Sequence, residues 1–258
     1  MLSLQERHKK ILDLLNNKGE VRVNELSDIF EVSEVCIRND LSELENKGML
    51  SRVHGEAIGA YEPYYNMSLA QRSSTNKEEK EEIAGKIAEM IHDNQTIMMN
   101  AGTTPLAVMR KLTNKKNITI ITNSIVLALE GAKYKNFRII LLGGEVDFEY
   151  QFVYGTMTLT QLDAYYADKF IMSADGIDAE GGITTYYDQE AEICRKMIEH
   201  SKSTIAALDR TKIGRVAFKK FADANDIDCL VTNGNAVKTP IKELKSGGLN
   251  VVLTKQRF

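Results

Sequence analysis

The sequence predicts an α/β protein in which a small winged helix-turn-helix domain precedes a larger, mainly parallel-sheet domain. Two observations support this prediction. Within the first sixty residues, three helical patterns are followed by a short alternating stretch, and a tight turn precedes the third helix. From Thr96 onwards, short apolar runs alternate with helical patterns, as expected of a parallel sheet covered by helices on both faces.

The composition is that of a soluble globular protein. The 258 residues suffice for one large and one small domain, and 43% are hydrophobic and 27% charged. No apolar run approaches the roughly 20 residues of a membrane span, and the N-terminus shows no signal-peptide pattern, so we expect a cytoplasmic protein. The three cysteines and four histidines are scattered, which argues against a disulfide framework and a metal site.

The first domain is expected over residues 1–58. The first helical pattern covers residues 4–15, and a second, short helix covers residues 23–30. Ser33 is placed to cap a third helix. The apolar residues expected to face inward on that helix are Val35, Ile37, Leu41 and Leu44. Residues 49–58 then alternate like a small β-hairpin, the wing of the module.

The polar face of the third helix carries side chains suited to double-stranded DNA. Arg38 can pair with guanine or phosphate, and Asn39 can read adenine. The expected DNA-contacting residues are Ser33, Glu34, Cys36, Arg38, Asn39 and Ser42 on the helix and Arg52 and His54 on the wing. The alternative is a protein-binding three-helix module. The eight basic and eleven acidic residues among residues 1–57 favour that alternative, because most DNA-binding modules are basic.

A linker is expected between the domains. Residues 59–76 have no clear hydrophobic period and include Pro63. Residues 77–91 then open with an acidic turn and carry a buried apolar stripe, so the larger domain is expected to cover residues 77–258.

The stretch from Thr96 to Leu106 predicts an anion pocket. An apolar run, Ile97 to Met99, indicates a buried strand, and a helical pattern starts directly after Gly102. We expect Thr103 or Thr104 as the N-cap and Pro105 as the first helical residue. Free backbone N–H groups and the positive end of the helix dipole would then face one point. The alternative is an ordinary strand-to-helix turn.

Further predicted strands also end in small or polar residues. They cover residues 117–121, 137–142, 170–172, 204–208, 229–231 and 250–253. Because ligands of open α/β sheets bind at the carboxyl ends of the strands, we expect a polar pocket there for a small, oxygen-rich ligand. Asn123 and Ser124 offer a second capped helix start. Asp175 is suited to accept hydrogen bonds from hydroxyl groups, and Lys212 to neutralise a phosphate.

The first domain resembles the DeoR family of bacterial transcriptional regulators. The resemblance rests on Glu6-Arg7-His8, on the stretch from Val32 to Leu41 and on Arg52-Val53-His54-Gly55. The chain departs from the family pattern at Cys36 and Asn39 in the third helix and at Glu56 in the wing. We expect these departures to alter the phosphate contacts or the preferred operator sequence.

The larger domain resembles the sensor domain of the same family along nearly all of its length. The matching motifs are Ala101–Thr104, Thr122–Ser124, Leu142–Gly144, Gly155, Ala174–Asp178, Gly182–Thr184, Glu190-Ala191 and Asp209–Lys212. The resemblance implies the fold of sugar-phosphate isomerases and CoA-transferases, with a phosphorylated sugar or related metabolite as the effector. It places the effector against Asn100, Gly102, Thr103, Thr104, Asn123, Ser124, Gly143, Gly144, Asp175, Gly176, Glu190, Asp209 and Lys212. The family usually has aspartate where this chain has Asn100.

The sequence therefore predicts a DNA-binding transcriptional regulator, a repressor of a carbohydrate-utilisation operon, with no cofactor, metal or catalytic residue. Two modules on one duplex need half-sites about 34 Å or a multiple apart, so we expect a homo-oligomer, at least a dimer. The family resemblance extends this expectation to a tetramer. One alternative is a sugar-phosphate isomerase with an added helix-turn-helix module, whose acid–base groups would be Asp175, Glu190, Asp209 and Lys212. Another is a helix-turn-helix protein whose large domain only oligomerises.

Overall fold

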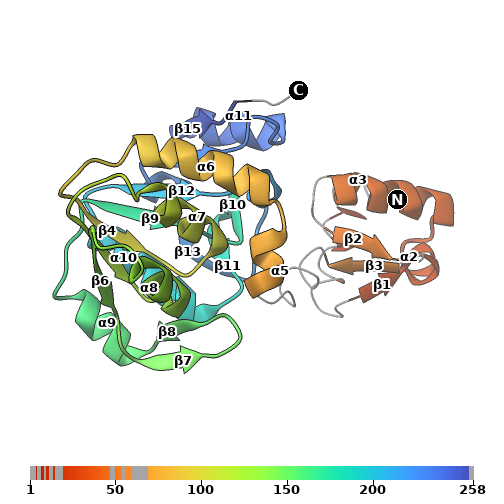
Figure 1. Ribbon diagram of the computed structural model, residues 1–258. Coiled ribbons are helices and arrows are strands. Elements are labelled where there is room, and N and C mark those ends of the chain that lie inside the picture. The colour runs from red at the N-terminus through yellow and green to blue at the C-terminus, as the bar shows by residue number, and fades with distance from the viewer. Residues whose placement is uncertain are drawn as a thin grey trace. The chain divides into compact units, whose positions relative to one another are not determined.

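The computed structural model describes residues 4, 7–8, 10–11, 14, 20–46, 50–53, 56–59 and 69–255. The chain divides into two compact units, residues 1–67 and 68–258 (Figure 1). Helix α5 (Leu69–Ser74) lies within the range expected as linker and belongs to the second unit.

The first unit is a winged helix-turn-helix, as predicted. The described residues of the first expected helix are helical, and α2 (Val23–Phe30) and α3 (Glu34–Asn46) follow as the second and third helices. Strands β2 (Leu50–Val53) and β3 (Glu56–Gly59) pair antiparallel as the expected hairpin. Strand β1 (Glu20–Arg22), which the sequence did not predict, pairs with the other edge of β3.

The core of the first unit joins all of its described helices. Its fully buried side chains include Ile11, Leu26, Ile37, Leu41 and Leu44. The expectation that Val35 faces inward is wrong, because its side chain is 65% exposed. Residues 37, 41 and 44 follow the helical i, i+4, i+7 spacing, whereas residue 35 lies about 200° around the helix from residue 37.

A buried ion pair ties the first helix to α3. Both oxygens of the buried Asp40 carboxylate accept hydrogen bonds from the Arg7 guanidinium, and the Nη2–Oδ1 distance is 2.9 Å. Nε2 of His8 lies 3.4 Å from Oδ1 of the same carboxylate. The hydrogen bond to Asp40 raises the pKa of Arg7, so the guanidinium stays charged. This pair fixes α3, the helix expected to read DNA, against the rest of the unit.

The second unit is built on a seven-stranded, fully parallel sheet in the order β15-β14-β12-β9-β4-β5-β6. In chain order its strands are β4 (Thr96–Met99), β5 (Ile118–Thr122), β6 (Phe137–Leu141), β9 (Lys169–Met172), β12 (Thr204–Ala207), β14 (Cys229–Thr232) and β15 (Asn250–Leu253). Each corresponds to one of the predicted strands, so the predicted parallel sheet is confirmed.

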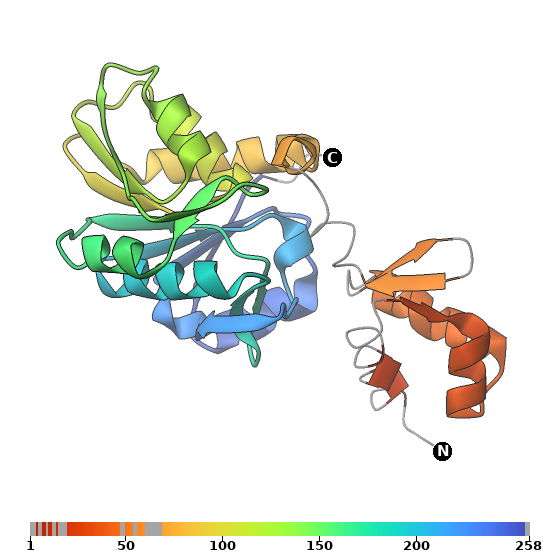
Figure 2. The same cartoon turned by 90° about the horizontal axis from the view of Figure 1, so that it is seen from below.

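Helices cover both faces of this sheet (Figure 2). One face packs against α6 (Lys77–Glu89), α7 (Thr103–Lys111) and α8 (Ile125–Gly131). The other packs against α9 (Thr156–Leu162), α10 (Asp188–Glu199) and α11 (Lys238–Ser246). Strand β4 supplies both layers, because Ile97 and Met99 belong to the first cluster and Met98 to the second. Its last three residues, which are buried, are therefore all apolar.

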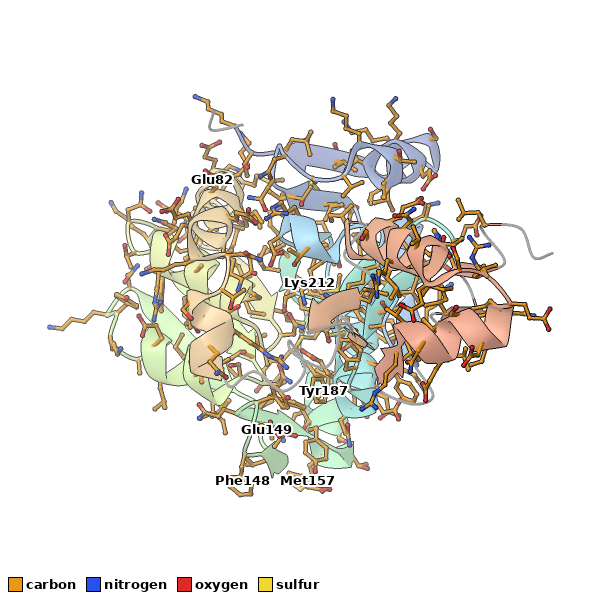
Figure 3. The ribbon with its side chains drawn as sticks, turned by 90° about the vertical axis from the view of Figure 1, so that its right-hand side faces the viewer. Glu82, Phe148, Glu149, Met157, Tyr187 and Lys212 are labelled. Atoms are coloured by element: carbon orange, nitrogen blue, oxygen red, sulfur yellow. The ribbon has the colours of Figure 1, made fainter. Side chains whose placement is uncertain are left out.

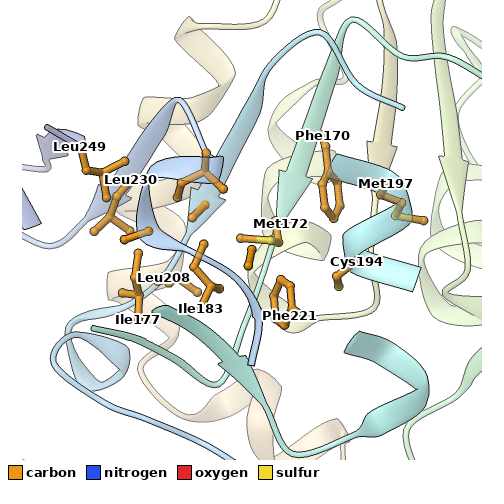
Figure 4. Packing of buried hydrophobic residues seen from close by; sticks show 14 of the residues in the cluster. Phe170, Met172, Ile177, Ile183, Cys194, Met197, Leu208, Phe221, Leu230 and Leu249 are labelled. Atoms are coloured by element: carbon orange, nitrogen blue, oxygen red, sulfur yellow. The ribbon is translucent and has the colours of Figure 1, made fainter. Parts of the chain in front are cut away.

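Shorter antiparallel elements, which the sequence did not predict, complete the second unit. Strands β10 (Gly176–Asp178), β11 (Gly182–Thr185) and β13 (Lys219–Ala222) form a three-stranded sheet. Strands β7 (Glu145–Asp147) and β8 (Phe152–Tyr154) form a hairpin. Two 3₁₀ turns are η1 (Arg210–Lys212) and η2 (Ala224–Asp226). Ile177, Ile183 and Phe221 of the small sheet pack into the core beside α10 (Figure 4).

Candidate functional site

The strand order reverses between β4 and β9. From β4 the chain builds β5 and β6 on one side and then returns to place β9 on the other side. Ligands of open α/β sheets bind at such a switch point, beyond the carboxyl ends of the strands. Asn100 follows β4, and its buried side-chain amide accepts from Ser173 N at 2.8 Å and donates to Ser173 O at 3.0 Å. The Asn100 amide therefore bridges the switch point in one fixed orientation.

Helix α7 starts at this point. The helix begins at Thr103, and its N-cap residue is Gly102, which has no side chain to accept a capping hydrogen bond. The prediction that Thr103 or Thr104 is the N-cap is therefore wrong. Pro105 is the third helical residue, not the first as predicted. An N–H group at the third position would have no acceptor within the helix, so proline is still tolerated there. Gly102 and Thr103 are partly exposed and Thr104 is buried. A Cβ atom at residue 102 would lie 2.1 Å from Ser173 Oγ, so the backbone here is as close to β9 as glycine allows.

A group of polar side chains from separate elements meets beside Asn100. We call Asn100, Asp175, Thr185, Glu190 and Lys212 the polar cluster. The buried Asp175 carboxylate accepts hydrogen bonds from Thr185 Oγ1 at 3.1 Å and from Tyr186 N at 3.1 Å, and it lies 3.4 Å from Lys212 Nζ. Burial lowers the pKa of Lys212 to about 8, although Asp175 opposes this shift. Such a perturbed, paired group at a strand end marks a candidate binding site.

Glu190 enters the polar cluster from the first turn of α10. Its Oε1 accepts from Asn100 Nδ2 at 3.0 Å, and its Oε2 lies 3.3 Å from Thr185 Oγ1. Surrounding atoms crowd the carboxyl group, yet the residue keeps some accessible surface. Desolvation, and then the charge of Asp175, raise its pKa to about 8. Burial also raises the pKa of Cys194, whose Sγ lies 3.3 Å from the same Asn100 nitrogen.

Three aromatic side chains, Tyr150, Phe152 and Tyr187, pack together, and Tyr187 is two residues from Thr185 of the polar cluster. Tyr187 packs on Tyr150 and Phe152, with ring centroids 4.5 Å and 6.1 Å away. Arg72 of α5 places its guanidinium carbon 4.3 Å from the Tyr150 centroid and donates to Tyr187 Oη at 3.3 Å. The buried Lys80 donates to Arg72 O at 2.6 Å and so fixes α5 on α6. Tyr187 and Lys212 are labelled in Figure 3.

Sequence reasoning missed Arg72, Thr185 and Tyr187 as candidate site residues. Arg72 lies in a six-residue helix that is too short to show a hydrophobic period. Thr185 ends a four-residue strand whose pairing partners are set by the tertiary fold. No local sequence signal distinguished these residues.

Two other expected effector residues follow β5. Asn123 donates from Nδ2 to Val153 O at 3.2 Å, and Ser124 caps α8, with Leu127 N donating to its Oγ at 3.2 Å. The capped helix start predicted here is confirmed. Oδ1 of the buried Asn123 has no hydrogen-bond partner among the described residues.

The expected glycines and Asp209 have structural contacts. Gly143 N donates to Gln161 Oε1 at 3.0 Å, and a Cβ atom at Gly144, where φ is +153°, would lie 2.4 Å from Tyr154 O. A Cβ atom at Gly176 would lie 2.3 Å from Arg215 O. The Asp209 carboxylate accepts from Thr211 N at 3.0 Å and thereby caps the turn that carries Lys212. These contacts place Gly143 against α9 and Gly144 against β8. Asp209 contributes to the polar cluster indirectly, because it caps the turn that positions Lys212.

The outward face of α3 carries the expected DNA-contacting residues. Arg38 and Asn39 are exposed, and Arg38 pairs with Glu34 one turn away at 2.8 Å. Ser33 accepts from Cys36 N at 3.3 Å, which confirms the cap predicted for α3, and Ser42 donates to Arg38 O at 2.8 Å. Arg52 lies in β2, opposite Ala57. His54 lies outside the described residues.

The described residues also bear on membrane-spanning helices and metal sites. None of the helices that the structure describes is both long and apolar enough to cross a membrane. Within the same part of the chain, His, Cys, Asp and Glu side chains form no group of three or more that could hold a metal ion.

Several solved structures are similar in fold to part of this chain, although their sequences differ strongly from it. A ribose 5-phosphate isomerase A from Methanocaldococcus jannaschii matches at a TM-score of 0.37 and 13% identity, over 51% of this chain and 52% of that one. The eIF2B beta subunit from Chaetomium thermophilum matches at a TM-score of 0.44 and 15% identity, over 60% of this chain and 48% of that one.

Comparison of the sequence with known families and proteins covers almost the whole chain. Residues 7–60 match the DeoR-like helix-turn-helix domain and residues 75–234 the DeoR C terminal sensor domain. The chain is 34% identical to the HTH-type transcriptional regulator GolR of Listeria innocua over 97% of this chain and 98% of that protein. It is 32% identical to the HTH-type transcriptional repressor GlcR of Bacillus subtilis over 98% of this chain and 97% of the relative. It is also 34% identical to the glycerol-3-phosphate regulon repressor of Escherichia coli over 88% of this chain and 90% of that protein. With its helix-turn-helix unit, its parallel-sheet unit and these relatives, the chain belongs to the DeoR family of transcriptional regulators.

Proposed function

We propose that this protein represses a carbohydrate-utilisation operon and that a phosphorylated sugar, or a related anionic metabolite, controls it by binding to the second unit. The names of the relatives support repression, since GlcR and the glycerol-3-phosphate regulon protein are both called repressors. The proposal places the protein in the cytoplasm, where its DNA would be.

The observation that carries the effector proposal is the polar cluster at the switch point of the sheet. Its members come from the ends of β4, β9, β11 and β12 and from the start of α10. Burying ionisable groups is costly, and such groups concentrate at functional sites. A structural role alone would not require Asp175, Glu190 and Lys212 to be gathered where ligands of this sheet class bind.

The charges around the cluster favour an anionic ligand that also carries hydroxyl groups. Arg72 and Arg215 are the cations whose charges act on Lys212. Asp175 and Asn100 supply oxygen atoms suited to sugar hydroxyls, and the start of α7 supplies backbone N–H groups. We therefore assign the phosphoryl group to the cations and the hydroxyl groups to the Asp175–Asn100 side.

Binding can be tested by thermal denaturation of the full chain with a panel of phosphorylated sugars. An effector at 100 times its dissociation constant is expected to stabilise the second unit by about 2.7 kcal/mol. No response to any member of the panel would favour a second unit that only oligomerises.

We propose that the second unit does not catalyse isomerisation, although Glu190 and Lys212 are acid–base groups with shifted pKa values. The relatives are named as regulators, and a complete helix-turn-helix unit has no role in an isomerase. A coupled isomerase assay with the same sugars checks this. Turnover of about one per second or more, within the ordinary range of enzymes, would overturn this part of the proposal.

We propose that α3 reads the operator through Ser33, Glu34, Cys36, Arg38, Asn39 and Ser42, with Arg52 and His54 of the wing on the DNA backbone. Replacing Arg38 with alanine is expected to weaken operator binding by about 1–3 kcal/mol. If the contact is to phosphate, the salt dependence of log K should also fall by about one unit of slope. Fluorescence anisotropy with labelled operator at several salt concentrations measures both quantities.

The matched control is Arg138→Ala, which removes an exposed arginine from β6 in the second unit. We expect operator affinity and salt slope to stay as in the wild type. An Arg38→Ala protein that behaves like this control would remove Arg38 from the contact surface.

We propose that the protein acts as a homo-oligomer, because a single helix-turn-helix unit reads too few base pairs to be specific. Two such units on one face of a duplex need half-sites about 34 Å apart, or a multiple of it. Sedimentation of the full chain tests whether it is a monomer, a dimer or a tetramer.

A further inference from the structure

One hydroxyl group in the polar cluster is shared by two carboxyl groups. Thr185 Oγ1 lies 3.1 Å from Asp175 Oδ2 and 3.3 Å from Glu190 Oε2. A threonine hydroxyl has one proton and can donate to only one of these oxygens. If both carboxyl groups were ionised, one of the two contacts would place a carboxylate oxygen against the hydroxyl oxygen with no hydrogen atom between them. The geometry therefore requires a second proton, on one of the two carboxyl groups.

The hydrogen bonds around the two carboxyl groups decide which of them holds that proton. Asp175 accepts a hydrogen bond from Tyr186 N at 3.1 Å and lies 3.4 Å from Lys212 Nζ. Both contacts favour the charged form of the Asp175 carboxyl group. Apart from the shared Thr185 hydroxyl, the donor that Glu190 has among the described residues is Asn100 Nδ2, which lies 3.0 Å from Oε1. The Asn100 amide cannot turn over, because Ser173 N donates to its oxygen at 2.8 Å. The free proton position is thus Glu190 Oε2, which faces Thr185.

We propose that Glu190 is a neutral carboxylic acid in the effector-free protein, donating to Thr185, and that its proton keeps the site cationic enough to take an anionic effector. The inference rests on the proposed function, because it concerns the regulation of the same site. The charges of Arg72 and Arg215 act on Lys212 together with those of Asp175 and Asp209. An ionised Glu190 would add a second carboxylate charge beside Asp175 and so disfavour an anion.

Other charged groups near α10, among the described residues, have the following contacts. From α5, Arg72 acts on Glu190 through its charge and donates to Tyr187. From β13, Lys219 pairs with the exposed Asp188 at 3.3 Å. From α9, Asp163 pairs with Lys196, two turns along α10. The thiol of Cys194 stays protonated, since burial raises its pKa.

A linkage between effector binding and pH follows. Glu190 and Lys212 both have a pKa of about 8, and an anion favours the protonated form of each. Affinity for an anion should therefore be highest below pH 8 and fall as the pH rises through it. Each group contributes about a tenfold loss between about pH 7 and pH 9, so the wild type should lose about 100-fold.

Substitution by glutamine tests the proton on Glu190. Glu190→Gln keeps an acceptor for Asn100 and a donor for Thr185 but cannot titrate. Its affinity for inorganic phosphate should fall about tenfold over the same pH range, the share of Lys212. The matched control is Glu192→Gln, an exposed glutamate on the same helix, which should show the wild-type loss of about 100-fold. Any change in phosphate ionisation is common to all three proteins and cancels from the comparison.

The protonation itself can be observed without any effector. Infrared difference spectra of the full chain should show the carbonyl band of a protonated carboxylic acid near pH 7, absent by about pH 9 and missing from Glu190→Gln. No such band in the wild type would overturn the proposal, whether or not an effector exists. An equal pH dependence of phosphate affinity in Glu190→Gln and the wild type would overturn the linkage. A band that behaves as expected in a protein that no phosphorylated sugar stabilises would support the neutral acid and refute the proposed function.

Discussion

Replacing Lys212 by methionine is expected to leave operator binding intact and to raise the effector concentration that releases DNA at least about 30-fold, since truncating one partner of a buried charge pair costs roughly 2–5 kcal/mol. Methionine keeps most of the volume of the side chain, which is buried, but removes the cation assigned to the phosphoryl group. Operator release is measured by anisotropy as effector is added. Release at the wild-type effector concentration would refute this role for Lys212.

The substitution also leaves Asp175 without its lysine, so a loss of folding has to be distinguished from a loss of binding. Lys202→Met is the matched control. Lys202 precedes β12 at its amino end, is 78% exposed in its side chain and pairs with Asp168. Its substitution should change neither release nor stability. The thermal unfolding of Lys212→Met, followed in the same buffer, shows whether the second unit is still folded.

Replacing Asp40 by alanine is expected to destabilise the first unit by about 3–5 kcal/mol, because it leaves the buried Arg7 guanidinium without its partner. That is a large share of the stability of a domain of this size. The protein should then lose operator binding while the second unit still binds effector. Urea denaturation, followed separately for the two units, measures the difference in free energy of unfolding.

Asp28→Ala provides the comparison for Asp40, since it removes an exposed carboxylate from α2 of the same unit. Surface substitutions of this kind usually change stability by no more than about 0.5 kcal/mol. If Asp40→Ala were no more harmful than Asp28→Ala, the buried pair would not be what fixes α3.

The parallel sheet was predictable because its strands carry their signal locally. The central strand is a short apolar run buried on both faces, as Ile97, Met98 and Met99 show, and the other strands are also short and mainly apolar. The turn before α3 and the cap at Ser124 were also readable, since both depend on residues within one helical turn. What these segments become is largely decided by their nearest neighbours in sequence.

The antiparallel strands and the contacts between the site residues were not predictable for the opposite reason. Strands β10, β11 and β13 have three or four residues each, too few to show alternation, and they exist because they pair with one another. Glu190 reaches Asn100 across ninety residues, and Arg72 reaches Tyr187 across more than a hundred. Gly144 shows how one glycine can have two explanations. Its positive φ and the nearby Tyr154 carbonyl give it a structural role, and its contact with the effector stays a prediction.

The most direct test of the account is a footprint of the full chain on the DNA upstream of its own gene, with and without phosphorylated sugars. We predict protection of two half-sites whose centres are about 34 Å or a multiple apart. At least one sugar that stabilises the second unit should remove this protection, and the footprint of Lys212→Met should persist at the same concentration. Protection that no such sugar alters would contradict the claim that occupancy of the polar cluster controls the DNA-reading helix.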